Sequence, residues 1–189
     1  MSRKVANAVA AFVFASSATL SAPPTAHVGG TPQGVTMQGA RLADTVGHYS
    51  VVLPAGWILD PGSQGGDLSF SDAKSRVTCR IITMDPSPLS VREQFNLFRD
   101  AQPEVYKSVT KVRQEWRTLD GERAGFLESR KTKQEGDRIY AWNVISVRVS
   151  RPYVIECQSL VDQAEEVRGS VEQLIGSFRW LANPTREDK

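Results

Sequence analysis

The sequence predicts an α+β domain in which a mostly antiparallel β-sheet packs with two main α-helices. Several short stretches rich in β-branched and aromatic residues are bounded by Gly, Pro and Asp, as is typical of strands. Two other stretches carry apolar residues at helical spacing behind capping residues. The order along the chain is strands, a helix, many strands and a final helix, which is the order that an α+β domain shows.

The first 26 residues have the layout of a secretory signal peptide. Arg3 and Lys4 precede an acid-free apolar run that ends near Leu20, and small residues and prolines follow up to Ala26. Cleavage after Ala26 fits best, because Pro23 would hinder an earlier cut. The alternative is an uncleaved membrane anchor, but the run is shorter than the ~20 apolar residues of a spanning helix. The sequence therefore predicts a periplasmic or secreted protein whose mature chain has no membrane span.

The mature chain is expected to be neutral and to form one domain. Removing 26 of the 189 residues leaves 163, and two of the 23 basic residues leave with them, so 21 basic and 21 acidic residues remain. A neutral chain gives little support to nucleic-acid binding, and its length supports one core. We expect residues 27–46 to be a flexible segment, 47–182 a single domain and 183–189 a polar tail.

The two cysteines, Cys79 and Cys157, both fall in stretches that are predicted to be strands. In an oxidising compartment, two cysteines of one core most simply form a disulfide. A disulfide that closes the loop from Cys79 to Cys157 would reduce the conformational entropy of the unfolded chain. In the entropy model this stabilises the folded state by roughly 4 kcal/mol. The alternative is a pair of unbridged buried thiols. Neither cysteine has a Cys or His neighbour at ligand spacing, so no metal site is expected.

The first part of the domain should contain short strands and one helix. Strands are expected over residues 48–53, 57–59, 68–70 and 77–84. Ser90 and Glu93 fit a capping box, and Phe95 and Phe98 follow at helical spacing. Pro103 is expected to end this helix.

A hairpin should follow, because strands over 111–119 and 122–131 flank Asp120-Gly121. One face of its first strand carries Val112, Gln114 and Trp116. The other face carries Lys111, Arg113, Glu115 and Arg117. Such alternation indicates a sheet with one wet side.

Two long strands and a helix complete the domain. The strand over 139–149 has apolar residues on both faces, which indicates a central strand covered on both sides over part of its length. Arg151-Pro152 turns the chain into the strand over 153–161. Asp162 is the expected N-cap of the last helix. Its apolar stripe comprises Val167, Val171, Leu174, Ile175 and Phe178.

Segments near both ends of the domain resemble a known family. Tyr-Ser-Val-Val-Leu-Pro-Ala-Gly-Trp at 49–57, followed by Leu-Ser-Phe at 68–70, looks like the opening of PsbP-like and DcrB-like domains. Tyr-Val-Ile-Glu-Cys at 153–157 and Ile-Gly-Ser-Phe at 175–178 are similar to that group's last strand and helix. The resemblance spans residues 48–181 and implies a PsbP-like α/β/α sandwich. It also implies binding of another macromolecule without catalysis, and no partner-binding residue set is carried over from the group.

No catalytic constellation stands out in the sequence. His27 lies in the N-terminal segment and His48 at the start of a strand, and no Gly-x-Ser-x-Gly elbow accompanies them. The glycines at 62, 65 and 66 lack the context of a phosphate loop and indicate a hairpin loop. Dispersed carboxylates are interpreted as solvated sheet edges: Glu122, Glu128, Glu135 and Asp137. The sequence therefore predicts no enzyme and no cofactor.

A tryptophan side chain is large and apolar, so each tryptophan is most often a core residue. Trp57 follows the Pro-x-Gly turn and is expected to be a packing anchor. Trp116 lies among charged neighbours and is the better candidate for exposure on a binding face. Trp116, Arg113 and Arg117 are the predicted binding residues.

These expectations lead to one hypothesis and two alternatives. The hypothesis is an exported, non-enzymatic binding or assembly domain of chaperone type, whose partner is another envelope protein. The first alternative is a carrier of a small ligand or lipid, which requires an apolar cavity of roughly a few hundred Å³ between sheet and helices. The second is an enzyme, which requires His48 beside a carboxylate and a hydroxyl in a cleft. The sequence leaves the oligomeric state open.

Overall fold

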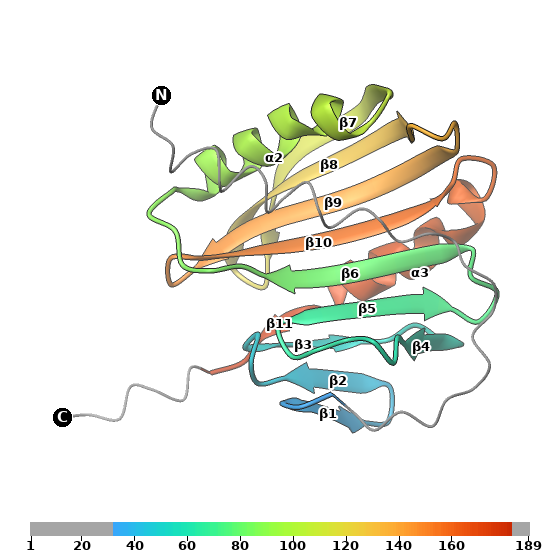
Figure 1. Ribbon diagram of the computed structural model, residues 1–189. Helices are drawn as coiled ribbons and strands as arrows, with labels where there is room; N and C mark the ends of the chain where they lie inside the picture. The colour runs from blue at the N-terminus through green and yellow to red at the C-terminus, as the bar shows by residue number, and fades with distance from the viewer. Residues whose placement is uncertain (1–31, 183–189) are drawn as a thin grey trace.

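The computed structural model describes residues 32–182 (Figure 1). The predicted leader 1–26 and tail 183–189 lie outside the described residues. The first strands are β1 (Val35–Gln38), β2 (Arg41–Asp44), β3 (Tyr49–Val52), β4 (Trp57–Leu59), β5 (Asp67–Asp72) and β6 (Val77–Thr83). After helix α2 (Val91–Val105) come β7 (Ser108–Leu119), β8 (Glu122–Thr132), β9 (Arg138–Arg148) and β10 (Arg151–Leu160). Helix α3 (Ala164–Gly176) and β11 (Arg179–Trp180) complete the described fold.

The strands form two sheets in which every pairing is antiparallel. The larger sheet has the order β4-β5-β6-β10-β9-β8-β7, and the smaller has the order β1-β2-β3-β11. Helix α2 lies against one face of the larger sheet, while α3 and the smaller sheet pack against the other (Figure 1). The predicted α+β class, with a mostly antiparallel sheet and two helices, is confirmed for residues 32–182.

Two hydrophobic clusters hold these layers together. The larger cluster joins the sheet to α3 and the smaller sheet, with Trp142, Phe70 and Phe178 almost fully buried. The smaller cluster joins α2 to the opposite face through Phe95, Phe98 and Ile145. Strand β9 therefore contributes to both clusters, which confirms the prediction of a central strand with apolar residues on both faces.

The expectation that residues 27–46 are a flexible segment is wrong over residues 35–44. There β1 and β2 form a hairpin, and β2 continues the smaller sheet by pairing with β3. Leu42 is fully buried, and the buried Asp44 carboxylate accepts backbone N–H groups of Val46, Gly47 and Gly66. Two four-residue strands are too short to give a clear alternation in the sequence, so contacts with the rest of the fold decide their structure.

The helix signals are confirmed in part. The Ser90–Glu93 capping box is present, but Pro103 lies inside α2, which ends at Val105. A proline in the last turn removes one N–H, and the helix still closes with the Tyr106 N–H donating to the Gln102 carbonyl at 3.1 Å. The expected Asp162 N-cap is also wrong, because the chain turns over 161–163 and places Gln163 at the cap without a side-chain hydrogen bond.

The predicted disulfide is present. Cys79 of β6 and Cys157 of β10 are directly opposite each other in the register of the two central strands. Both side chains are fully buried in the larger cluster, where they link strands 78 residues apart in sequence. The alternative of two unbridged thiols is therefore excluded.

Close packing of α2 on the sheet depends on one glycine. A Cβ atom added to Gly125 of β8 would lie 2.2 Å from the ring of Phe95, whereas one added to Gly169 of α3 would meet nothing within 4 Å. We expect Gly125→Ala to lower the free energy of unfolding by about 1–3 kcal/mol, because the Phe95 ring must move. Gly169→Ala is the control and should stabilise α3 by about 0.5–1 kcal/mol. Urea unfolding measures both, and an unchanged Gly125→Ala midpoint would contradict this packing.

Candidate functional site

Strand β7 forms one free edge of the larger sheet. It is twelve residues long, pairs with no strand other than β8 within residues 32–182, and most of its side chains are exposed. The pairing shifts by one residue at Val112, which forms a bulge whose side chain is 47% exposed. Bulges and charged side chains are the devices by which proteins prevent unwanted pairing of edge strands. Strand β7 has both the bulge and the charged side chains, so its own structure limits which other chains can associate with this edge.

The bulge corrects the predicted alternation of this strand. Lys111 lies opposite Ser129, while Arg113 lies opposite Glu128. Neighbouring residues of β8 point to opposite faces, so Lys111 and Arg113 lie on different faces of the sheet. The extra residue at the bulge is what reverses the alternation, and no turn residue marks it in the sequence.

The three predicted binding residues do not share one face. Trp116 lies on the α2 side, where its ring contacts Phe95 at 5.3 Å between centroids and the Arg123 guanidinium lies 4.3 Å above it. Trp116 is 37% exposed, whereas Trp57 is 8% exposed. Arg113 and Arg117 lie on the opposite side, so only a partner that reaches the edge of β7 can contact all three.

The two arginines share one carboxylate. Glu115, between them on β7, forms ion pairs with Arg113, at 2.9 Å, and with Arg117. The Arg117 guanidinium also lies over the Phe126 ring, 4.2 Å from its centroid. Both guanidinium groups are therefore oriented by the protein and remain 39–48% exposed.

A hollow of about 350 Å³ lies beside Arg117, between the β7–β8 hairpin and the end of α3. Its apolar lining residues are Leu119, Phe126, Ile175 and Phe178. Its charged lining residues are Arg117, Asp120, Glu172 and Arg179. A lining that combines apolar side chains with charges of both signs is compatible with a protein–protein contact, in which apolar and polar groups occur together.

Sequence reasoning missed a charged network on the same face. Glu128 was expected at a solvated edge, but its side chain is 3% exposed and accepts hydrogen bonds from Tyr140 and Arg168. Arg168 of α3 also pairs with Glu165, and these hydrogen bonds raise the pKa of Arg168 well above its ordinary value. Burial, and then the bond to Glu128, raise the pKa of Tyr140. All of these groups are paired, so the network attaches α3 to the sheet.

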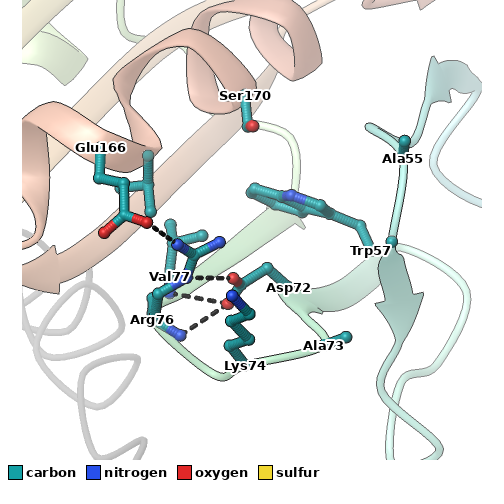
Figure 2. A pocket seen from close by; sticks show the side chains of 11 residues that line it. Ala55, Trp57, Asp72, Ala73, Lys74, Arg76, Val77, Glu166 and Ser170 are labelled. Atoms are coloured by element: carbon teal, nitrogen blue, oxygen red, sulfur yellow. Dashed lines mark hydrogen bonds and ion pairs between the residues drawn. The ribbon is translucent and has the colours of Figure 1, made fainter.

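A second hollow, of about 210 Å³, lies under the Leu-Pro-Ala-Gly-Trp turn (Figure 2). Trp57 forms one wall, and Arg76 lies between Asp72, at 2.8 Å, and Glu166 of α3. The charges of Arg76, Asp72 and Glu166 are therefore paired within the protein. Trp57 is buried against the core, as expected of a packing anchor.

The glycines that the sequence analysis considered for a phosphate loop have a structural role. The glycines at 62, 65 and 66 lie in the loop between β4 and β5, and a Cβ on Gly65 would lie 2.6 Å from the Gln33 carbonyl oxygen. This loop is the predicted hairpin connection. Within residues 32–182, no three His, Cys, Asp or Glu side chains come together in a way that could hold a metal ion. In the same range no helix is long and apolar enough to cross a membrane.

The fold is shared with several solved structures. The cyanobacterial PsbP protein CyanoP from Synechocystis sp. PCC 6803 has a TM-score of 0.53 at 18% identity, over 84% of this chain and 99% of its own. The Saccharomyces cerevisiae Ran-binding protein Mog1p has a TM-score of 0.56 at 10% identity, over 77% and 97%. LpqN of Mycobacterium tuberculosis, involved in cell envelope biogenesis, has a TM-score of 0.54 at 11% identity, over 71% and 83%. These likenesses establish a PsbP-like fold.

Comparison of the sequence with protein families and curated proteins identifies no family for this chain. No protein-family model matches the chain, and no curated protein matches it. The chain is thus a PsbP-like α+β domain with an exposed edge strand and an adjoining hollow.

Proposed function

We propose that this protein is an exported, non-enzymatic domain of the cell envelope that binds another envelope protein through β7 and the hollow beside it. The observation that carries this proposal is the edge strand itself. It presents the half-exposed Trp116 on one face and the oriented Arg113 and Arg117 on the other, next to a hollow lined by both apolar and charged residues. Trp and Arg are the residue types that most often dominate protein–protein binding energy.

The predicted compartment rests on two independent features. Residues 1–26 have the basic, apolar and proline-containing layout that predicts a secretory leader. The domain contains a buried disulfide, a bond that persists in oxidising compartments. The described uses of this fold are compatible with the proposal, since Mog1p is a Ran-binding protein and LpqN takes part in envelope biogenesis.

The packing of the core favours this proposal over a lipid carrier. The space between the larger sheet and α3 is filled by large side chains that are at most 2% exposed: Trp142, Tyr49, Phe70, Phe126 and Phe178. The two hollows described above lie at the surface and have charged walls. A lipid chain needs a predominantly apolar cavity. Neither hollow has that character, so binding of a protein surface fits the structure better.

Site-specific photo-crosslinking in the native envelope tests the proposal. A photoreactive phenylalanine analogue is placed at Val112 of β7 and, as control, at Ile58 of β4, the other edge of the same sheet. Both side chains are 47% exposed. We expect one discrete protein adduct from position 112 and none from position 58. Trp116→Ala should weaken binding to the captured partner by at least about 30-fold, as loss of a hot-spot residue does. Equal adducts at both positions, or none at either, would contradict the proposal.

A further inference from the structure

A third hollow, of about 250 Å³, lies at the end of the molecule where the β9–β10 turn meets the β2–β3 turn. Its lining residues include Arg148, Arg151, His48 and Tyr153, and within residues 32–182 no acidic residue lines it. It is separate from the β7 surface of the proposed function, because it is formed by other turns. The concentration of basic groups around one concave space is its distinguishing feature.

The two arginines are placed against each other by the strand register. Arg148 and Arg151 are directly opposite in the last pair of the β9–β10 ladder, and like charges in that position destabilise a sheet. Among residues 32–182, neither forms a salt bridge with a carboxylate. Arg148 donates a long hydrogen bond to the Leu181 carbonyl, at 3.5 Å, and its guanidinium lies 5.1 Å from the Trp180 ring centroid. Neither contact neutralises the charge.

Nearby acids are engaged elsewhere or stay apart. Asp44 is buried and already accepts three backbone N–H groups from neighbouring loops. Asp85 lies in the segment that bonds to the turn and forms no ion pair among the described residues. Burial raises the pKa of Tyr153, the positive charges of Arg151 and Arg148 oppose this shift, and the Asp44 carboxylate adds to it. Both guanidinium charges therefore act on the ring that lines the hollow.

The backbone around the hollow is strained. Five non-glycine residues of the described chain have positive φ, and three of them are here: His48 at 56°, Val149 at 49° and Ser150 at 61°. A two-residue turn with two positive φ angles normally contains Asn and Gly, and a β-branched residue there is a genuine outlier. Neighbouring backbone holds the turn, because Ser87 donates to the Ser150 carbonyl at 2.6 Å and Met84 donates to the Pro152 carbonyl at 2.9 Å. Strained backbone conformations that neighbouring contacts hold in place occur most often at functional sites.

We propose that this hollow binds a phosphate group between the Arg148 and Arg151 guanidinium groups, with His48 at its rim. Planar guanidinium groups match phosphate oxygens with paired hydrogen bonds. A phosphate monoester is close to a dianion at neutral pH, so it neutralises both arginines and removes the repulsion that the register imposes. The group can belong to a free phosphorylated compound or to a lipid headgroup.

Titration of the mature protein with inorganic phosphate tests the site. The arginine side-chain N–H signals and the His48 imidazole are followed by NMR spectroscopy. We expect saturable shifts in the wild type and at least ten-fold weaker binding in Arg151→Gln. Arg151→Lys, which keeps the charge and loses the fork, should lie between them. Arg138→Gln is the matched control, because Arg138 is exposed at the opposite end of β9. Thermal unfolding shows that each variant is folded.

Vesicles distinguish the two sources of phosphate. The wild type and Arg151→Gln are sedimented with phosphatidylcholine vesicles that contain or lack phosphatidic acid, whose headgroup is a phosphate monoester. Sedimentation that requires both phosphatidic acid and Arg151 assigns the group to a lipid headgroup. Saturable phosphate binding without sedimentation assigns it to a soluble compound. The proposal is overturned if phosphate gives no saturable shifts, or if Arg151→Gln and Arg138→Gln bind it as the wild type does.

Discussion

Loss of the Cys79–Cys157 disulfide is expected to lower the free energy of unfolding by roughly 4 kcal/mol. The bond closes a loop of 78 residues, and opening it restores the conformational entropy of that loop to the unfolded chain. Both cysteines are fully buried, so substitution by alanine also removes packed sulfur from the core. A domain of this size has a total stability of about 5–15 kcal/mol, which makes the disulfide a large part of it.

Urea unfolding with and without dithiothreitol measures this loss in the wild type. Cys79→Ala/Cys157→Ala should unfold at low urea concentration under both conditions, because it has no bond left to reduce. Protein isolated from an oxidising compartment should show no free thiol after denaturation until reductant is added. A wild type that unfolds at the same urea concentration with and without reductant would contradict the prediction.

Removal of one member of the buried Lys131–Glu156 pair should cost about 3 kcal/mol. Lys131 of β8 is covered by α2, and its Nζ lies 3.3 Å from Glu156 Oε1 and 4.5 Å from the Tyr106 ring centroid. Glu156→Gln leaves an ammonium group buried without its counter-charge, which is strongly destabilising. The double variant Lys131→Met/Glu156→Leu removes both charges and should recover most of the loss, because apolar replacements of buried pairs are often neutral.

The loss in Glu156→Gln should depend on pH with a definite sign. Burial lowers the pKa of Lys131, and Glu156 opposes this effect in the wild type. In Glu156→Gln the pKa should fall further, because only burial then acts on the group. A folded-state pKa below the unfolded value of ~10.4 means that the unfolded chain binds more protons between the two values, so stability rises with pH there. The deficit of Glu156→Gln should therefore shrink as the pH rises toward 10.

Urea unfolding at pH 7 and at pH 9.5 measures both the cost and its pH dependence. Glu135→Gln, at an exposed position, is the control and should match the wild type at each pH. If Glu156→Gln were as stable as this control at pH 7, the pair would contribute nothing to folding.

Several elements could be predicted because their signals are local. The Ser90–Glu93 capping box and the Asp120-Gly121 hairpin each depend on residues within a few positions of one another. The apolar stripe of the last helix was likewise readable, and Val167, Val171 and Leu174 are buried as expected. Hydrogen bonds and side-chain periodicity of this kind hold in almost any tertiary context.

Other features depended on contacts between distant segments. The β1–β2 hairpin is ordered by contacts that place Leu42 in the core, and its own sequence gives only a weak signal. The bulge at Val112 moves Lys111 to the face opposite Arg113. Glu128 was expected at a solvated sheet edge, yet the register of β8 buries it on the α3 side of the sheet and buries Lys131 on the α2 side. No short-range pattern carries this information.

The sequence alone determined the class of fold and the residue types available for binding, and it supplied one of the two features that support the proposed compartment. It also placed both cysteines in strands, but their pairing required a β6–β10 register that spans 78 residues. The tertiary structure alone decided that β7 bulges at Val112, which puts Lys111 on the face opposite Arg113. It alone brought Arg148, Arg151 and His48 around one hollow. The physical reason is the distance along the chain between the interacting residues. Turns and caps depend on residues a few positions apart, whereas strand registers, sheet faces and hollows depend on which strands lie side by side.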